Sequence, residues 1–261
     1  MAKTVADVMK MVKENEVKFV DFRFTDTRGK QQHTTVPVSH FDEDKFISGH
    51  AFDGSSIAGW KGIEASDMQL IPDPNSANID PFFEETTLIL TCDVIEPSDG
   101  KAYDRDPRSI AKRAEAYLKA SGLGDTAYFG PEPEFFIFDG VRWSTEPNHT
   151  FYEIEEYEAP WNTGSKLEGG NRGHRPTVKG GYFPVPPVDS TQDMRAEMSL
   201  ILESLGIPVE VFHHEVAGAG QNEIGTRFST LVERADWTML QKYVIHNVAN
   251  AYGKTATFMP K

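Results

Sequence analysis

The chain has 261 residues, of which 39% are hydrophobic and 25% charged, a composition typical of a folded protein that excludes a miniature scaffold or wholesale disorder. Twenty-six basic residues stand against 40 acidic ones, and the net charge of −14 disfavours binding to nucleic acid or to an anionic membrane through bulk charge. The single cysteine, Cys92, cannot form an intramolecular disulfide, and we find neither a secretory signal nor a membrane-spanning run. We therefore expect a cytoplasmic protein.

The first hundred residues predict a small α+β domain. A capping-box pattern at residues 4–7 opens a short amphipathic helix. Strands are expected at 17–24 and, after a turn at 27–30, at 31–38, and a β-branched run predicts a third strand at 88–95.

A polar joint that contains prolines follows this region. Asp106 and Pro107 are typical of the start of a helix, which we expect to end near Gly122. We therefore place the domain boundary near residue 103, with domains at 1–103 and 104–261.

The second region begins with a predicted strand at 128–138. About forty polar and glycine-rich residues follow, up to Gly181, and a segment of this length is typical of a functional or mobile loop. The remaining expected elements are a helix over 190–206, paired strands at 207–216 and 221–231, a helix over 236–252 and an extended segment at 255–259.

Paired carboxylates are the strongest chemical signal in the sequence. Glu132 and Glu134 stand two residues apart at the start of an apolar strand, so both should point to one face. Acidic residues at the end of a strand are usually only solvated, and this pair alone would not indicate a site.

A second acidic group surrounds a glycine-rich reversal at 217–220. A four-residue loop would place Glu215 opposite Asn222, whereas a five-residue loop or a bulge would place it opposite Glu223. Two carboxylates 4 Å apart repel by about 4 kcal/mol at an effective dielectric constant near 20. Three or four converging glutamates therefore need protonation or a divalent cation, and oxygen ligands suit Mg²⁺ or Mn²⁺.

Four segments together resemble bacterial type I glutamine synthetase. They are Phe52–Ile57, Gly130–Glu134, Lys179–Pro184 and His213–Glu223, in the order of that family. The resemblance implies an α+β protein with a β-grasp-like N-terminal domain, followed by the first part of a catalytic α/β barrel-like domain. In the family, the segment at 255–261 leads into further active-site segments that this sequence does not contain. We therefore expect the N-terminal half to two-thirds of such an enzyme, and a 261-residue chain that is inactive alone.

The resemblance also assigns roles to individual residues. It implies one metal ion on Glu134, Glu215 and Glu223, and a second on Glu132 with ligands from outside this chain. The other implied positions are Asp53 and Ser56 in the ammonium pocket, Tyr182 beside it, Glu210 and Phe228 at the nucleotide, and Trp60 at the edge of a neighbouring active site. For Phe228 and Trp60, ordinary packing is an alternative interpretation.

The implied reaction is the ATP-dependent ligation of ammonium to L-glutamate through γ-glutamyl phosphate. Two divalent cations, Mg²⁺ or Mn²⁺, would neutralise the phosphates, and Asp53 is the candidate base for the ammonium proton. The resemblance further implies a homo-oligomer, a dodecamer with active sites shared between subunits. A ligase that joins glutamate to another amine and a catalytically incomplete fragment or assembly module are the alternatives.

Overall fold

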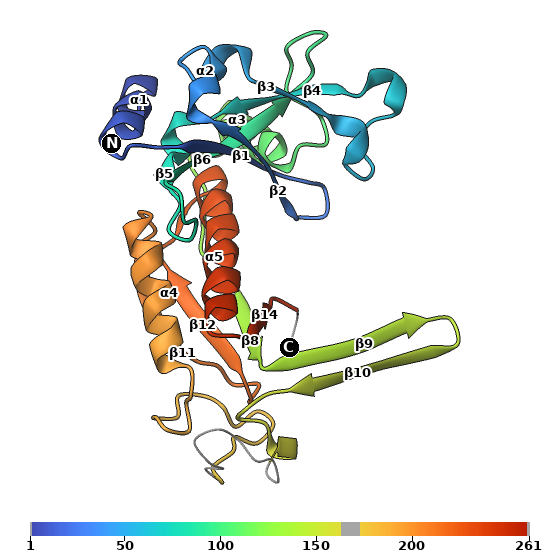
Figure 1. Ribbon diagram of the computed structural model, residues 1–261, viewed down its shortest axis with the longest axis vertical. Coiled ribbons are helices and arrows are strands. Elements are labelled where there is room, and N and C mark those ends of the chain that lie inside the picture. The colour runs from blue at the N-terminus through green and yellow to red at the C-terminus, as the bar shows by residue number, and fades with distance from the viewer. Residues whose placement is uncertain (1, 163–172, 260–261) are drawn as a thin grey trace. The chain divides into compact units, whose positions relative to one another are not determined.

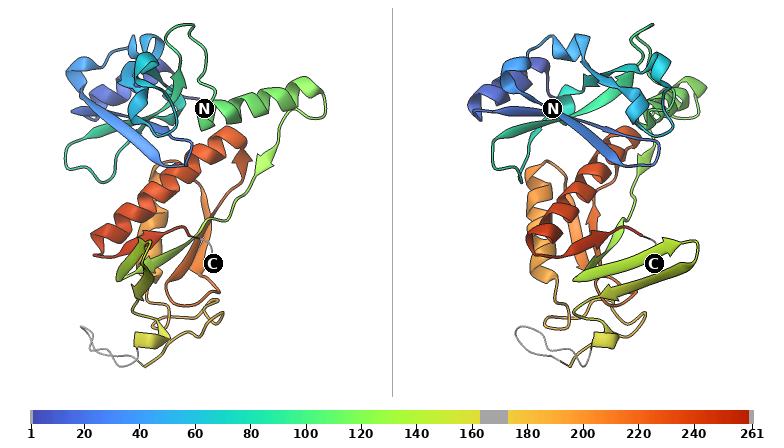
Figure 2. Two further views of the ribbon diagram at one scale, coloured as in Figure 1. Left: turned by 90° about the vertical axis from the view of Figure 1, so that its right-hand side faces the viewer. Right: turned by 45° about the vertical axis from the view of Figure 1, so that its right-hand side comes forward.

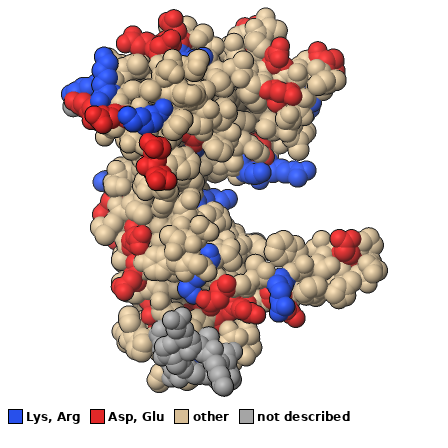
Figure 3. All heavy atoms as spheres, in the orientation of Figure 1, with Lys and Arg blue, Asp and Glu red and all other residues tan. Residues whose placement is uncertain are grey.

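The computed structural model describes residues 2–162 and 173–259 and divides the chain into two compact units (Figure 1). The first unit comprises Met1–Phe129 and Thr230–Asp236, and the second comprises Gly130–Ser229 and Trp237–Lys261. None of the described helices is long and apolar enough to cross a bilayer. In Figure 3, acidic and basic side chains are spread over the visible surface of both units and form no single continuous patch.

The first unit is built on one mixed sheet. Its strands run in the order β2-β1-β6-β4-β3, with β5 also paired to β6. β1 is antiparallel to β2 and parallel to β6. Its elements are α1 (Val5–Glu14), β1 (Phe19–Thr25), β2 (Gln31–Pro37), α2 (Lys45–Ser48), β3 (His50–Asp53), β4 (Asp67–Pro72), β5 (Asn78–Ile79), β6 (Thr87–Ile95), α3 (Pro107–Ser121) and β7 (Tyr128–Phe129).

Local sequence signals explain the helix ends in this unit. Thr4 and Asp7 form the predicted capping box, in which each side chain accepts a hydrogen bond from the other residue's backbone amide. The Asp106 carboxylate caps α3, and Gly122 ends it in a left-handed conformation with φ +73°. The predicted helix starts and ends are therefore confirmed here.

Residues 104–129 pack with the first unit. The guanidinium of Arg108, at the start of α3, lies 2.6 Å from the carboxylates of both Asp93 and Asp73, and it also pairs with Asp236 at 2.9 Å. Asp93 of β6 and Asp73, directly after β4, thereby hold the start of α3 against the sheet, and Asp236 of the first unit joins the same cluster.

The second unit contains a four-stranded antiparallel sheet in the order β11-β12-β8-β14. α4 packs against β11 and β12, and α5 lies along the same sheet, where the Gln241 amide donates to the Ile224 carbonyl of β12 at 2.8 Å (Figure 2). The elements are β8 (Glu134–Phe138), β9 (Gly140–Glu146), β10 (His149–Glu155), α4 (Gln192–Ser204), β11 (Val209–His214), β12 (Gln221–Thr226) and β14 (Thr255–Thr257). β13 (Ser229–Thr230) and α5 (Leu231–Ala251) are divided between the two units, because Thr230–Asp236 belong to the first.

Three expectations for the second region are corrected. The strand predicted over 128–138 is interrupted between β7 and β8, where Pro131 and Pro133 cannot donate ladder hydrogen bonds. The predicted long loop contains the hairpin β9–β10, and its residues 163–172 lie outside the described part of the chain. α5 begins at Leu231, five residues before the expected start. The predicted α+β fold class is confirmed.

Candidate active site

The reversal between β11 and β12 determines which acidic side chains share a face. The amide of Glu215 donates to the carbonyl of Gln221 at 2.8 Å, across a loop at 216–220. Glu215 therefore faces Gln221, and neither expected register, opposite Asn222 or opposite Glu223, occurs. Because Gln221 and Glu223 are two residues apart on one strand, Glu215 and Glu223 still point to the same face of the sheet.

His213 joins these two glutamates in a compact cluster. One ligand atom from each of His213, Glu215 and Glu223 lies within 4.8 Å of the others. The imidazole Nε2 is 3.7 Å from a Glu223 oxygen, and Nδ1 is 4.0 Å from a Glu215 oxygen. Sequence reasoning missed His213, although its position two residues before Glu215 on a predicted strand was a usable signal.

The other two glutamates come from the neighbouring strand and the segment before it. Glu134, the first residue of β8, lies opposite Glu223 in the ladder. Its carboxylate accepts a hydrogen bond from the side-chain amide of Gln221 at 2.5 Å. Glu132 is exposed and precedes the strand. The charges of both carboxylates act on Glu223, so all four predicted metal ligands belong to one acidic surface of the second unit.

The electrostatics of this surface favour a bound cation. Burial raises the pKa of the Glu223 carboxyl and the surrounding glutamates raise it further, while His213 lowers it. A divalent cation would remove this repulsion, and carboxylate oxygens are ligands that suit Mg²⁺ and Mn²⁺. The residues present therefore fit a metal ion.

Tyr182 lies beside the cluster. Its ring stacks on Phe183 at a centroid distance of 3.8 Å and meets the His213 ring edge-on at 5.6 Å. Phe183 and Lys179 have positive φ values of 59° and 60°, which are uncommon for residues with a side chain. This strained segment brings the exposed Tyr182 ring next to His213.

Asp53 and Ser56 belong to the first unit, at the end of β3 and in the short 3₁₀ turn after it. The Asp53 carboxylate accepts hydrogen bonds from the Ser55 amide at 2.8 Å, the Ser55 hydroxyl at 2.6 Å and the Ser56 hydroxyl at 3.2 Å. The bonds from Ser55 lower the pKa of Asp53, with a smaller contribution from Ser56. Asp53 is therefore an exposed, stable anion at neutral pH.

The remaining predicted positions differ in exposure. Glu210 lies exposed at a bulge of β11 and borders a cavity of about 370 Å³ beside α4, and Phe228 is 53% exposed. Trp60 is only 5% exposed and packs against Phe24 and Tyr103 in the core of the first unit. Packing is therefore what the structure describes for Trp60, and its contact with a neighbouring active site stays a prediction.

Two family profiles match the chain. "Glutamine synthetase, beta-Grasp domain" covers residues 16–97, and "Glutamine synthetase, catalytic domain" covers residues 104–261. The chain belongs to the glutamine synthetase family. The predicted resemblance is thereby confirmed.

Three proteins illustrate what this chain is similar to. A protein named 3-hydroxylaminophenol mutase, from Cupriavidus pinatubonensis, is 77% identical over 261 residues, which are 100% of this chain and 55% of that protein. Glutamine synthetase of Methylococcus capsulatus is 62% identical over 258 residues, or 99% of this chain and 55% of the relative. The cryo-EM structure of Plasmodium falciparum glutamine synthetase superposes with a TM-score of 0.89 at 28% identity, covering 100% of this chain and 52% of that one. The chain thus spans about half the length of these relatives.

Proposed function

We propose that the complete protein that carries this chain ligates ammonium to L-glutamate at the expense of ATP. The observation that supports this most directly is the acidic surface formed by Glu132, Glu134, Glu215 and Glu223 with His213, in a member of the glutamine synthetase family. A surface of this charge would repel ATP, and it becomes an ATP site only together with divalent cations.

The reaction explains the residue types. A carboxylate does not react with ammonia at neutral pH, so the γ-phosphoryl group of ATP is first transferred to the glutamate side chain. Ammonia then attacks the acyl carbon of γ-glutamyl phosphate, and phosphate leaves with the bonding electrons. Bound Mg²⁺ or Mn²⁺ would supply charge neutralisation for the phosphoryl transfer. Glu134, Glu215 and Glu223 would hold one ion and Glu132 would contribute to a second, while Glu210 and Phe228 would contact the nucleotide.

Asp53 would act on the ammonium ion. A carboxylate whose pKa is lowered by hydrogen bonds from Ser55 is well suited to attract a cation, and it is a weaker base than an unperturbed aspartate. We therefore propose binding as its main contribution and proton acceptance as an additional one. Ser56 would line the same pocket, and Tyr182 would border it.

The proposal includes assembly and location. We propose a cytoplasmic homo-oligomer, a dodecamer in which neighbouring subunits share active sites and in which Trp60 reaches a neighbouring site. Domains at 1–103 and 104–261 are supported by the two matched regions, 16–97 and 104–261.

One observation favours a second candidate function. The relative that is 77% identical is named 3-hydroxylaminophenol mutase, whereas the glutamine synthetase of Methylococcus capsulatus is 62% identical. A mutase reaction on such a compound would rearrange it without change of mass and without consumption of ATP. A third candidate is a ligase that uses another amine in place of ammonium, and the experiment below includes it.

The experiment compares these substrates on the complete protein. Glutamate, ATP and Mg²⁺ are supplied with ammonium or with a primary amine, and a separate reaction contains 3-hydroxylaminophenol alone. We expect glutamine and phosphate in equal amounts with ammonium. An ATP-independent product of unchanged mass, in the absence of any glutamine, would replace the proposal with the mutase function.

A further inference from the structure

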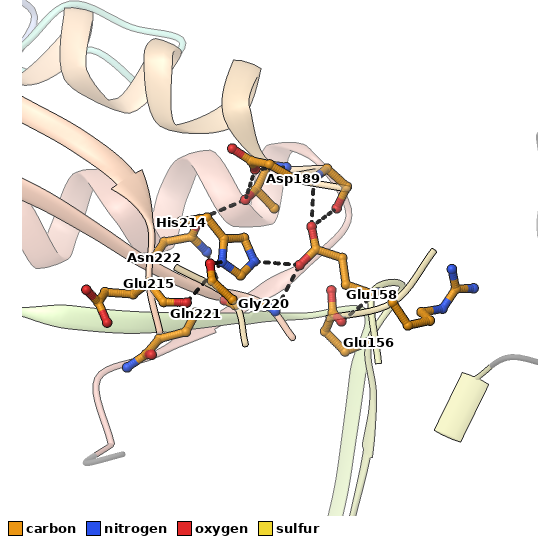
Figure 4. A network of polar contacts seen from close by, with 12 residues as sticks. Glu156, Glu158, Asp189, His214, Glu215, Gly220, Gln221 and Asn222 are labelled. Carbon is orange, nitrogen blue, oxygen red and sulfur yellow. Dashed lines mark hydrogen bonds and ion pairs between the residues drawn. The ribbon is translucent and has the colours of Figure 1, made fainter. Parts of the chain in front are cut away.

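A buried histidine next to the cluster has a distinct arrangement of partners. The side chain of His214 is 0% exposed, and its ring faces three oxygen atoms (Figure 4). Nε2 lies 2.7 Å from a Glu158 carboxylate oxygen, and Nδ1 lies 2.6 Å from the Gly181 carbonyl and 3.0 Å from the Glu215 carbonyl. The two carbonyl oxygens accept and cannot donate, so Nδ1 carries a proton that both of them face. The ring is therefore held between the Glu158 carboxyl group on one side and two backbone carbonyls on the other.

The Glu158 carboxylate connects segments that are distant in the sequence. One oxygen accepts from the Ser190 amide and hydroxyl, both at 2.6 Å, and the other accepts from the Gly220 amide at 3.2 Å as well as from His214. Burial opposes the charge of Glu158, but the hydrogen bond from His214 and those from Ser190 bring its pKa to about 2. A fixed anion therefore ties β11, the β11–β12 reversal and the segment before α4 together.

The segment that carries Tyr182 is attached to the same point. The amides of Lys179, Gly181 and Phe183 donate to the carbonyls of Ala217 at 3.1 Å, Val216 at 3.3 Å and His214 at 3.4 Å, respectively. The approach is so close that a Cβ on Gly181 would lie 2.6 Å from the Glu215 carbonyl oxygen.

The two residues whose carbonyls contact His214, Glu215 and Gly181, are each linked to the candidate site. The Glu215 carbonyl accepts from the ring, while its carboxylate points away from His214 (Figure 4). That carboxylate belongs to the cluster with His213 and Glu223. The Gly181 carbonyl accepts from the same ring nitrogen, and Tyr182 follows directly. A single atom of His214, Nδ1, thus contacts two backbone carbonyls. One belongs to the proposed metal ligand Glu215, and the other directly precedes Tyr182, which is proposed to border the ammonium pocket.

We propose that the hydrogen-bonded pair His214–Glu158 is a positioning device that holds Glu215 and Tyr182 in fixed relation, and so couples metal binding to ammonium binding. The inference rests on the proposed function for the roles of those two residues. Neither His214 nor Glu158 touches a substrate. Both act through the two backbone carbonyls that the His214 ring holds at Nδ1.

The test uses the complete protein with Glu158→Gln, which keeps the size of the side chain and removes its charge. Mn²⁺ binding is followed by the electron paramagnetic resonance signal of free Mn²⁺, and the KM for ammonium is measured separately. We expect both the Kd for Mn²⁺ and the KM for ammonium to rise about tenfold or more, the range seen when groups that orient metal ligands are removed. Glu158→Asp, which keeps the charge, should restore both in part.

A matched control separates positioning from loss of folded protein. Asp80, in the first unit, is also a buried carboxylate paired with a cation, since it accepts from Arg23 at 2.8 Å and from the Phe82 amide at 2.8 Å. Asp80→Asn should lower the turnover per mole of total protein only because less of the protein is folded. The Kd for Mn²⁺ and the KM for ammonium should stay unchanged. If Glu158→Gln behaves in the same way, the pair is merely structural and the inference is wrong.

Two further arms keep the test decisive. Should Glu158→Gln fail to fold, Ser190→Ala removes only one hydrogen bond to Glu158, and both constants should rise about two- to fivefold. Unchanged constants in a folded Ser190→Ala protein would overturn the inference. If the wild-type protein makes no glutamine, the proposed function fails, and Mn²⁺ binding alone still decides whether the pair positions Glu215.

Discussion

His213 and Glu223 lie directly opposite each other in the β11–β12 ladder, with Nε2 3.7 Å from a carboxylate oxygen. This separation is too long for a hydrogen bond but leaves room for a cation between the two groups. A divalent ion bound there would also neutralise Glu215, whose carboxylate belongs to the same cluster.

The first prediction concerns the charge of Glu223. In metal-free protein, Glu223→Gln should raise the midpoint of thermal unfolding, because it removes like-charge repulsion on the order of 1 kcal/mol. With Mn²⁺ present, the wild type should gain stability and the variant should gain much less. Thermal unfolding with a chelator and with excess Mn²⁺ measures both effects. Replacement of an exposed glutamate, Glu203→Gln, serves as the control. Equal stabilisation of the wild type and Glu223→Gln by Mn²⁺ would mean that the ion binds elsewhere.

The second prediction concerns the close approach at Gly181. A Cβ there would lie 2.6 Å from the Glu215 carbonyl oxygen and 2.9 Å from the Gly218 Cα, so Gly181→Ala must displace backbone. We expect a loss of about 1–3 kcal/mol in unfolding free energy and a large loss of activity, because Tyr182 moves with the segment. Gly124→Ala, whose nearest neighbour would be 3.8 Å away, should change neither. Denaturant unfolding and turnover with ammonium provide the measurements.

Much of the fold could be predicted because its signals are local. Thr4 with Asp7 and Asp106 with Gly122 determine helix ends through bonds within a few residues. The hairpin over 140–155 was missed because both of its faces are largely exposed, so its side chains show no apolar alternation.

The site could be predicted only in part, for a related reason. Residue spacing left open whether Glu215 and Glu223 share a face, because the register depends on the loop conformation, including φ values of 119° at Gly218 and 70° at Gly220. The partner of His214, Glu158, is 56 residues away in the sequence. No local pattern connects these two residues, and only the folded sheet brings them together.

The third prediction concerns Asp53. Asp53→Asn keeps the shape of the side chain but removes the charge that attracts ammonium and the oxygen that can accept its proton. We expect the KM for ammonium to rise at least tenfold and amide formation to slow by about a hundredfold, with ATP binding unchanged. Single-turnover glutamine formation and nucleotide titration give the two quantities. Unchanged turnover across a pH series would remove Asp53 from the ammonium site.

The last prediction is a pH dependence of stability that originates at Glu156. This buried carboxyl accepts a hydrogen bond from the Glu158 amide at 2.6 Å, and burial together with the negative charge of Glu158 raises its pKa to about 8. The folded protein therefore retains a proton that the unfolded chain releases near its ordinary pKa of about 4.5. Its stabilising contribution is complete below pH 4.5 and is lost as the pH rises toward 8.

Glu156→Gln isolates this effect, since glutamine keeps the size and the acceptor oxygen but does not titrate. The difference in unfolding free energy between the variant and the wild type should grow in favour of the variant between pH 5 and pH 8, by on the order of a few kcal/mol. The titrations of His214 and Glu158 are common to both proteins and cancel to first order. Thermal unfolding of the complete protein at several pH values measures the difference, with the exposed Glu155→Gln as the matched control. A difference that is constant with pH would mean that Glu156 is ionised in the folded protein at neutral pH, and would contradict the prediction.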